Sequence, residues 1–130
     1  MAMDNSSIPE DLRRFVLTSI PSVPFLEALL LMRADPDYAW RRDTLARRLY
    51  VREKTAEDLL ADLCTARIAV PCEEAGAYRY GPADAGLRER IDRLADAYAA
   101  HLVEVTHLIH SSLDRKAQQF ADAFKWRKDS

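Results

Sequence analysis

Glycine is scarce in this chain, and the motifs that enzymes build from glycine are missing with it. Only three glycines occur among 130 residues, Gly76, Gly81 and Gly86, and they form no loop of the kind that cradles a phosphate group. The three histidines all fall between positions 101 and 110, and no serine motif resembles a nucleophile elbow. The sequence therefore predicts a protein that is not an enzyme and that uses no cofactor.

Long apolar segments are also absent. The longest run, at residues 29–32, is far shorter than the roughly 20 residues of a membrane-spanning helix, so we expect a core helix there and no membrane span. The first residues, MAMDNSS, lack the basic and apolar regions of a secretory signal. The two cysteines, Cys64 and Cys72, fit a reducing compartment. These features favour a cytoplasmic protein.

One pattern suggests metal binding at first sight. His101, Glu104, His107 and His110 recur at every third position. On a helix each step of three turns the side chain by about 300°, so His101 and His110 end on opposite sides. The residues that share one side would need a further ligand from elsewhere. We predict no metal site in this segment.

Neither sign of charge dominates. The chain has 19 basic and 21 acidic residues, which gives a formal net charge of −2. A domain that binds nucleic acid usually has a basic surface. The overall charge therefore gives no support to nucleic-acid binding, and only a local basic segment could provide it.

A compact pattern is present between Trp40 and Pro82. Asp43 can cap a short helix, whose apolar stripe comprises Leu45, Ala46 and Leu49. A second helix is expected to begin near Arg52 after a corner filled by Val51, and its apolar side comprises Ala56, Leu59, Leu60 and Leu63. Two short alternating segments, 68–72 and 77–80, then predict a β-hairpin, with a turn at Glu73–Gly76.

This spacing resembles that of winged helix-turn-helix proteins, including the MarR-like bacterial transcriptional regulators. The resemblance is close from Trp40 to Pro82 and looser outside that segment. One departure lies in the corner, where the family usually has Gly or Ser and this chain has Tyr50-Val51-Arg52. The resemblance implies a mainly α fold with a small β-hairpin, DNA binding, and dimerisation through helices outside the wing.

The rest of the chain is expected to be helical. We divide it into a leader and first helix at 1–21, the winged-helix unit at 22–82, a long helix at 83–112 and an amphipathic tail at 113–130. Ser7, Ser22 and Asp84 are candidate helix caps. The tail is either a basic helix for a membrane surface or a partner, or, as we prefer, a terminal helix that docks Phe120 and Phe124 on the body.

A heptad seam runs along the long helix, which we expect from about Ala85 to Ser111. Steps of four and three residues connect its apolar positions, and Leu102 widens the seam. The members are Leu87, Ile91, Leu94, Tyr98, His101, Leu102, Val105 and Leu108. We predict that this seam forms a homodimer interface. The alternative is packing against the N-terminal helices of the same chain.

In winged-helix proteins the second helix of the pair enters the major groove and the first crosses the phosphate backbone. Arginines are concentrated in the expected first helix, its corner and the hairpin. They predict a phosphate-binding set of Arg41, Arg42, Arg47, Arg48, Arg52 and Arg79. Two residues at the start of the second helix, Lys54 and Thr55, are candidate base contacts. The alternative is a solvated surface on which the arginines pair with Glu53, Glu57 and Asp58.

The expected second helix is itself acidic. Between residues 52 and 62 it has two positive and four negative charges, and Glu73 and Glu74 add two negative charges at the hairpin tip. Carboxylates oppose the phosphate neutralisation that supplies most of the affinity for DNA. The sign of the charge over this helix therefore separates the two functions considered next.

The preferred function is that of a homodimeric, bacterial-type DNA-binding transcriptional regulator of the winged-helix type. The alternative is a winged-helix protein-interaction module that does not bind DNA. Its acidic recognition helix would bind a basic partner, such as a sigma factor, a polymerase subunit or a signalling protein. A negative surface throughout the second helix favours the alternative.

Overall fold

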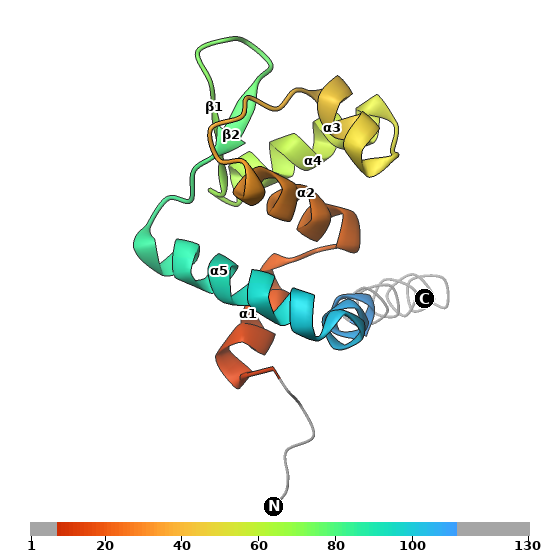
Figure 1. Cartoon of the computed structure of the whole chain (residues 1–130), viewed down its shortest axis with the longest axis vertical. Coiled ribbons are helices and arrows are strands. Elements are labelled where there is room, and N and C mark those ends of the chain that lie inside the picture. Colours follow the sequence, from red (N-terminus) through yellow and green to blue (C-terminus); the bar gives the residue numbers. More distant parts are fainter. Residues whose placement is uncertain (1–7, 112–130) are drawn as a thin grey trace, which may run out of the picture.

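The computed structural model describes residues 8–111 (Figure 1). The leader, Ser7 and the tail at 113–130 lie outside these residues, but the prediction that Ser7 caps the first helix is wrong, because the N-cap of α1 is Pro9. The elements are α1 (Glu10–Ser19), α2 (Val23–Ala34), α3 (Arg42–Leu49), α4 (Glu53–Thr65), β1 (Ala69–Pro71), β2 (Tyr78–Tyr80) and α5 (Ala85–Ala100), and residues 102–111 are again helical. The predicted class, mainly α with a small antiparallel hairpin, is confirmed.

Three of the helix starts follow the expected local chemistry. The Ser22 hydroxyl accepts a hydrogen bond from the Phe25 amide at 3.2 Å, and the Asp84 carboxylate accepts one from the Leu87 amide at 2.8 Å, so both predicted caps are confirmed. The helix α4 begins directly after Arg52, as expected. These signals act over a few residues, which is why they can be read from the sequence.

The start of α3 differs by two residues from the prediction. Arg41, not Asp43, is the N-cap, and its amide donates to the Thr44 hydroxyl at 3.0 Å. Trp40, just before it, exchanges two backbone hydrogen bonds with Tyr78 of β2, at 2.7 and 2.8 Å. This bridge keeps the chain extended up to Arg41, and the helix begins at the next residue.

The prediction of one continuous helix from Ala85 to Ser111 is wrong. The helix α5 ends at Ala100, and His101 has φ −137° and ψ 53°, which are not helical angles. The chain changes direction there (Figure 1). The break allows Val105 and Ile109, both fully buried, to pack against the body of the same chain, which a straight helix about 40 Å long could not do.

One apolar core connects all the helices, from Ile8 to Ile109. The central helix is α2, which lies between α5 on one side and α3, α4 and the hairpin on the other (Figure 1). It contributes Phe25, Leu26, Leu29 and Met32, all with at most 2% of their surface exposed. The unit formed by α3, α4 and the hairpin therefore packs against α2.

The hairpin is short and antiparallel. Ala69 pairs with Tyr80, Val70 with Arg79, and Pro71 with Tyr78. Tyr80 is buried and Arg79 exposed, as the alternation predicts, whereas Cys72 lies beyond the strand. The turn contains a glycine with φ of 81° at position 76, a conformation that glycine adopts without strain.

Candidate binding site

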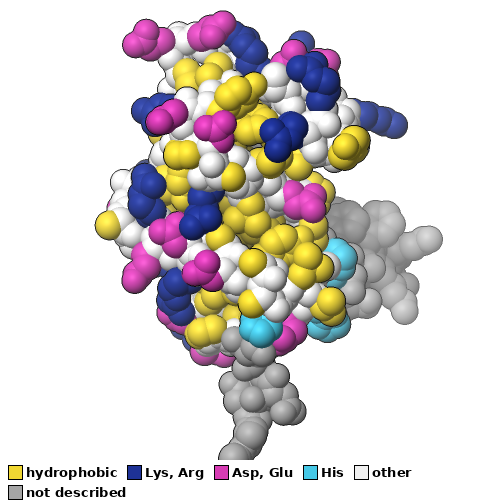
Figure 2. Space-filling view, in the orientation of Figure 1, with side chains coloured by type: hydrophobic (Ala, Val, Ile, Leu, Met, Phe, Trp, Pro, Cys, Tyr) yellow, Lys and Arg dark blue, Asp and Glu magenta, His cyan; other side chains and the backbone are white. Residues whose placement is uncertain are grey.

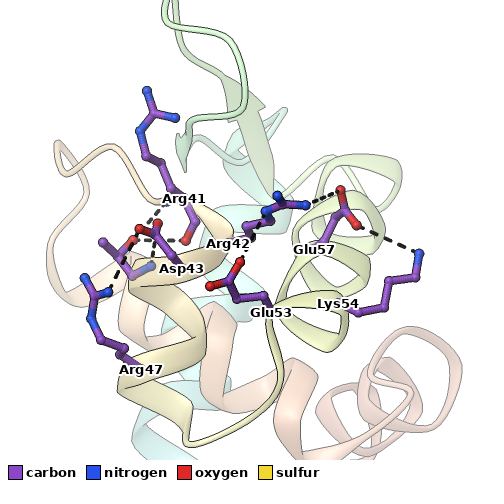
Figure 3. Close-up of polar contacts among 8 residues, drawn as sticks. Arg41, Arg42, Asp43, Arg47, Glu53, Lys54 and Glu57 are labelled. Atoms are coloured by element: carbon purple, nitrogen blue, oxygen red, sulfur yellow. Dashed lines mark hydrogen bonds and ion pairs between the residues drawn. The ribbon is translucent and has the colours of Figure 1, made fainter.

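An open groove lies between the start of α3, the outer side of α4 and the hairpin (Figure 3). Its volume is about 700 Å³, and it is lined by Arg41, Arg42, Asp43, Glu53, Glu57, Leu60, Ala61, Gly76 and Tyr78. The apolar members provide part of the wall, and five of the nine lining residues are charged. We refer to this feature as the groove.

Local structure explains how the groove forms. The Trp40–Tyr78 bridge holds the first turn of α3 beside the hairpin. On α4, Glu53 and Glu57 are four residues apart, so their carboxylates lie on the same side of the helix. Leu60 continues that side one turn further and is 2% exposed. Carboxylates and apolar surface thus face the same opening.

Basic side chains in and beside the groove are paired with carboxylates (Figure 3). Arg42 bridges both glutamates, with Nε 3.5 Å from Glu53 Oε1 and Nη1 3.5 Å from Glu57 Oε2. Lys54 Nζ lies 3.9 Å from Glu57 Oε1 and 3.2 Å from Asp58 Oδ1. The pairing that the sequence left open as an alternative for the arginines is therefore what the structure shows for Arg42, and Lys54, a candidate base contact, is paired with acids as well.

The hairpin neutralises the other arginine of the groove. Arg41 forms an ion pair with Glu74, and its Nη1 donates to the Ala75 carbonyl at 3.4 Å. The groove lining has two positive and three negative residues, before Glu74 is added. Exposed ion pairs contribute little to stability, but these pairs leave the groove with a negative balance.

The remaining predicted DNA contacts do not line the groove. Arg47 Nη1 is 4.0 Å from Asp43 Oδ2, and the Arg48 guanidinium lies 5.7 Å from the centre of the Trp40 ring. Arg52 and Arg79 are exposed and have no ion pair among residues 8–111. Arg48, at the C-terminal end of α3, does not line the groove, whereas Arg47 lies beside it through its pair with Asp43. The predicted set is thus divided between two surfaces.

Half of the residues of the predicted dimer seam are buried in the core of the chain. Ile91, Leu94, Val105 and Leu108 are buried in the core cluster. Leu87, Tyr98 and His101 are half-buried, and Leu102 is 53% exposed. A second copy could reach the four buried residues only if the core opened. Their burial supports the alternative of packing against the same chain.

Two exposed features were not anticipated from the sequence. Leu30 and Leu31 lie on the side of α2 away from its buried residues and are only half-buried. Tyr50, in the corner between α3 and α4, is 94% exposed and has a left-handed backbone with φ 59° and ψ 44°. The exposure of Leu30 and Leu31 could have been predicted, because α2 is apolar around most of its circumference and one side of it cannot face the core.

The structure also bears on metal binding, cysteine reactivity and membrane insertion. Among residues 8–111, no three His, Cys, Asp or Glu side chains lie together in a way that could hold a metal ion. Burial raises the pKa of the Cys64 thiol, which disfavours the reactive thiolate. Within the same residues, no single helix is long and apolar enough to cross a membrane, and α1 with α2 meet that criterion only as a pair bent by 108°.

Comparisons of the chain with protein-family models, with curated proteins and with solved structures find no match.

Proposed function

We propose that α3, α4 and the hairpin form a winged helix-turn-helix that acts as a protein-interaction module, and that the groove binds a basic segment of a partner protein. The order of the elements supports this assignment, as does the extended Trp40 paired with β2. In a winged helix the second helix of the pair is the recognition helix, which here is α4. Its chemistry therefore indicates the kind of partner.

The observation that supports this proposal is the pairing of every basic side chain near the groove with a carboxylate. Arg41, Arg42 and Lys54 are each engaged by glutamates of α4 or of the hairpin. A DNA duplex would have to disrupt these pairs and approach the freed carboxylates, although its affinity depends on phosphate neutralisation. A partner lysine or arginine meets favourable charge, and its aliphatic stem can pack on the apolar part of the wall.

DNA-binding transcriptional regulation remains the second candidate, because three of the predicted arginines are not paired with a carboxylate among the described residues. Arg52 and Arg79 have no ion pair among the described residues, and Arg48 rests on Trp40 rather than on an acid. Phosphates could contact the end of α3 and the corner that follows it. If this candidate is right, reversing the charges of Arg47 and Arg48 weakens binding to all DNA sequences alike.

Fluorescence anisotropy distinguishes the two candidates. The probes are a short labelled peptide of alternating lysine and leucine, the same peptide with glutamate in place of lysine, and a random-sequence duplex, each at about 20 mM and about 150 mM salt. We expect the lysine peptide to bind at low salt and the glutamate peptide and the duplex not to bind. Duplex binding that falls by two or more orders of magnitude over this salt range would overturn the proposal in favour of DNA.

Variants locate the peptide on the groove. The double substitution Glu53→Gln and Glu57→Gln removes two charges from the wall and is expected to weaken lysine-peptide binding by about tenfold or more. The matched control, Asp96→Asn together with Glu89→Gln, removes two exposed charges from α5 and should leave binding nearly unchanged. Equal losses in both double variants would show that only the overall charge matters, which would contradict a specific groove.

A further inference from the structure

The helix α2 has a second apolar stripe besides the one in the core. Leu30, Leu31 and Ala34 follow Glu27 at the spacing of one helix side, and all four are exposed or half-buried. The opposite side of α2 supplies the core residues described above. A helix that is apolar on nearly all sides is usually buried on all sides. We therefore expect another element or molecule to pack against the outer stripe.

This stripe forms one wall of a shallow hollow of about 440 Å³. The other wall is the end of α3 and the corner after it, and the residues lining the hollow are Glu27, Leu30, Leu31, Ala34, Arg48, Leu49 and Tyr50. None of them lines the groove. Figure 2 shows how much hydrophobic surface is gathered in the middle of one face of the molecule, with acidic and basic side chains intermingled around it.

Tyr50, an exposed member of the hollow, is also in an unfavourable conformation. Tyr50 has 94% of its surface exposed and a left-handed backbone, which is unusual for a bulky residue. Tyrosine is one of the residues that most often anchor protein interfaces. Its ring at the edge of the hollow supplies a large apolar contact for whatever covers the leucines.

The charges of the hollow indicate which molecule covers it. Glu27 lies on the α2 wall and Arg48 on the α3 wall, and neither has an ion pair among residues 8–111. A surface with one acid and one base on opposite walls is complementary to itself, because a two-fold axis places each charge against its opposite in the second copy. The Arg48 guanidinium is held by its contact with the Trp40 ring, 5.7 Å away.

We propose that the hollow is the interface of a two-fold symmetric homodimer. Glu27 of each copy pairs with the partner's Arg48, and each Tyr50 packs on the partner's Leu30 and Leu31. This surface differs from the heptad seam, whose central residues are occupied by the core. It is also independent of the groove, so either proposal can fail without the other.

Charge exchange between two variants of the full chain tests the interface. Sedimentation velocity over a range of protein concentrations should show the unmodified chain as a dimer. Glu27→Arg and Arg48→Glu each place like charges together at both contacts, and each is expected to weaken the dimer by about 100-fold or more. An equimolar mixture of the two variants restores opposite charges at both contacts, so a heterodimer should form from two chains that are separately monomeric.

Three controls keep the result interpretable. Circular dichroism tests whether each variant is folded. This control is needed because Arg48→Glu also removes the contact with Trp40. Val103→Asp places a charge at a 76% exposed apolar residue outside the hollow and should leave the dimer intact. Lysine-peptide binding should be unchanged in Glu27→Arg. A monomeric unmodified chain, or a mixture that stays monomeric while both variants are folded, would overturn the proposed interface.

Discussion

Tyr50 shows how a single residue can combine a local strain with an unused contact surface. A left-handed backbone is unfavourable for L-residues other than glycine by roughly 1–2 kcal/mol, and nothing in the described chain packs over the ring, which is 94% exposed. The proteins that the sequence resembles usually have Gly or Ser at such a corner. The strain and the exposure together suggest that the tyrosine is needed for something other than the stability of the monomer.

Substitution of Tyr50 should separate these two effects. We expect Tyr50→Gly to raise the free energy of unfolding of the monomer by about 0.5 kcal/mol, because relief of the left-handed strain exceeds the entropy cost of glycine. The same variant should weaken the proposed dimer. Urea unfolding at low protein concentration measures the first effect. Tyr50→Ala, which keeps the strain, is the control, and a gain of equal size in that variant would contradict the explanation.

Asp11 and Arg93 connect α1 to α5 through a bidentate ion pair. Arg93 Nη1 donates to Asp11 Oδ2 at 2.7 Å and Nη2 to Oδ1 at 3.0 Å. These side-chain hydrogen bonds are the largest cause of the lowered pKa of Asp11, which falls from its ordinary 3.8 to about 2. The folded chain therefore holds this carboxylate ionised at pH values where the unfolded chain protonates it.

The stability that comes from this pair should depend on pH. It is fully present above about pH 4 and is lost as the pH falls towards about 2, because the unfolded chain takes up the proton first. Asp11→Asn should have a lower Tm than the unmodified chain at about pH 6, and the difference should shrink towards pH 2. Glu10→Gln is the control, since Glu10 is exposed and 4.0 Å from Arg14. A difference that stays constant with pH would refute this role of Asp11.

Among the elements, the helix after the hairpin differs most from its prediction. The seven-residue spacing of apolar residues from Leu87 to Leu108 predicts one continuous helix, yet the helix is interrupted at His101. The amide of His101 still donates to the Ala97 carbonyl at 2.7 Å, and its carbonyl accepts from the Val105 amide at 3.0 Å. The break therefore loses little backbone hydrogen bonding while it brings the second segment onto the core.

Two leucines of this seam should respond differently to truncation. Leu94 is fully buried, so Leu94→Ala is expected to lower the free energy of unfolding by about 2–5 kcal/mol. Leu102 is 53% exposed, and Leu102→Ala should change it by no more than about 0.5 kcal/mol. Urea unfolding at two protein concentrations measures both. If the loss in Leu94→Ala came from dimerisation, it would depend on concentration, which would contradict packing within one chain.

At the scale of the whole molecule, surfaces of different character are separated around α2. The groove has paired charges with a negative balance, the end of α3 has Arg48 without an ion pair among residues 8–111 and Arg47 paired with Asp43, and the outer side of α2 has half-buried leucines beside Glu27. On the face shown in Figure 2, acidic and basic side chains of the described residues are intermingled rather than separated by sign. Among the described residues on this face there is no continuous basic area of the kind that a DNA-binding surface has, which agrees with the proposed protein-interaction module.

Local signals explain why much of the fold could be predicted. Helix caps at Ser22 and Asp84, the start of α4 and the turn at Gly76 depend on residues within about four positions of one another. The arginines of the candidate site could be named for the same reason, since they cluster in the sequence. Their partners could be named only as possibilities, because an ion pair between two helices depends on how the helices are placed.

The sequence alone thus determined the helical class, the hairpin and the starts of α2, α4 and α5, because hydrophobic period and capping act over short distances. Tertiary structure decided which side of each helix is covered. It bent the chain at His101, paired Arg42 with two carboxylates of α4, and joined Asp11 to Arg93 across 82 positions. It also left Leu30 and Leu31, on the outer side of α2, only half-buried. Each of these outcomes depends on contacts between residues distant in the chain, and no local pattern encodes them.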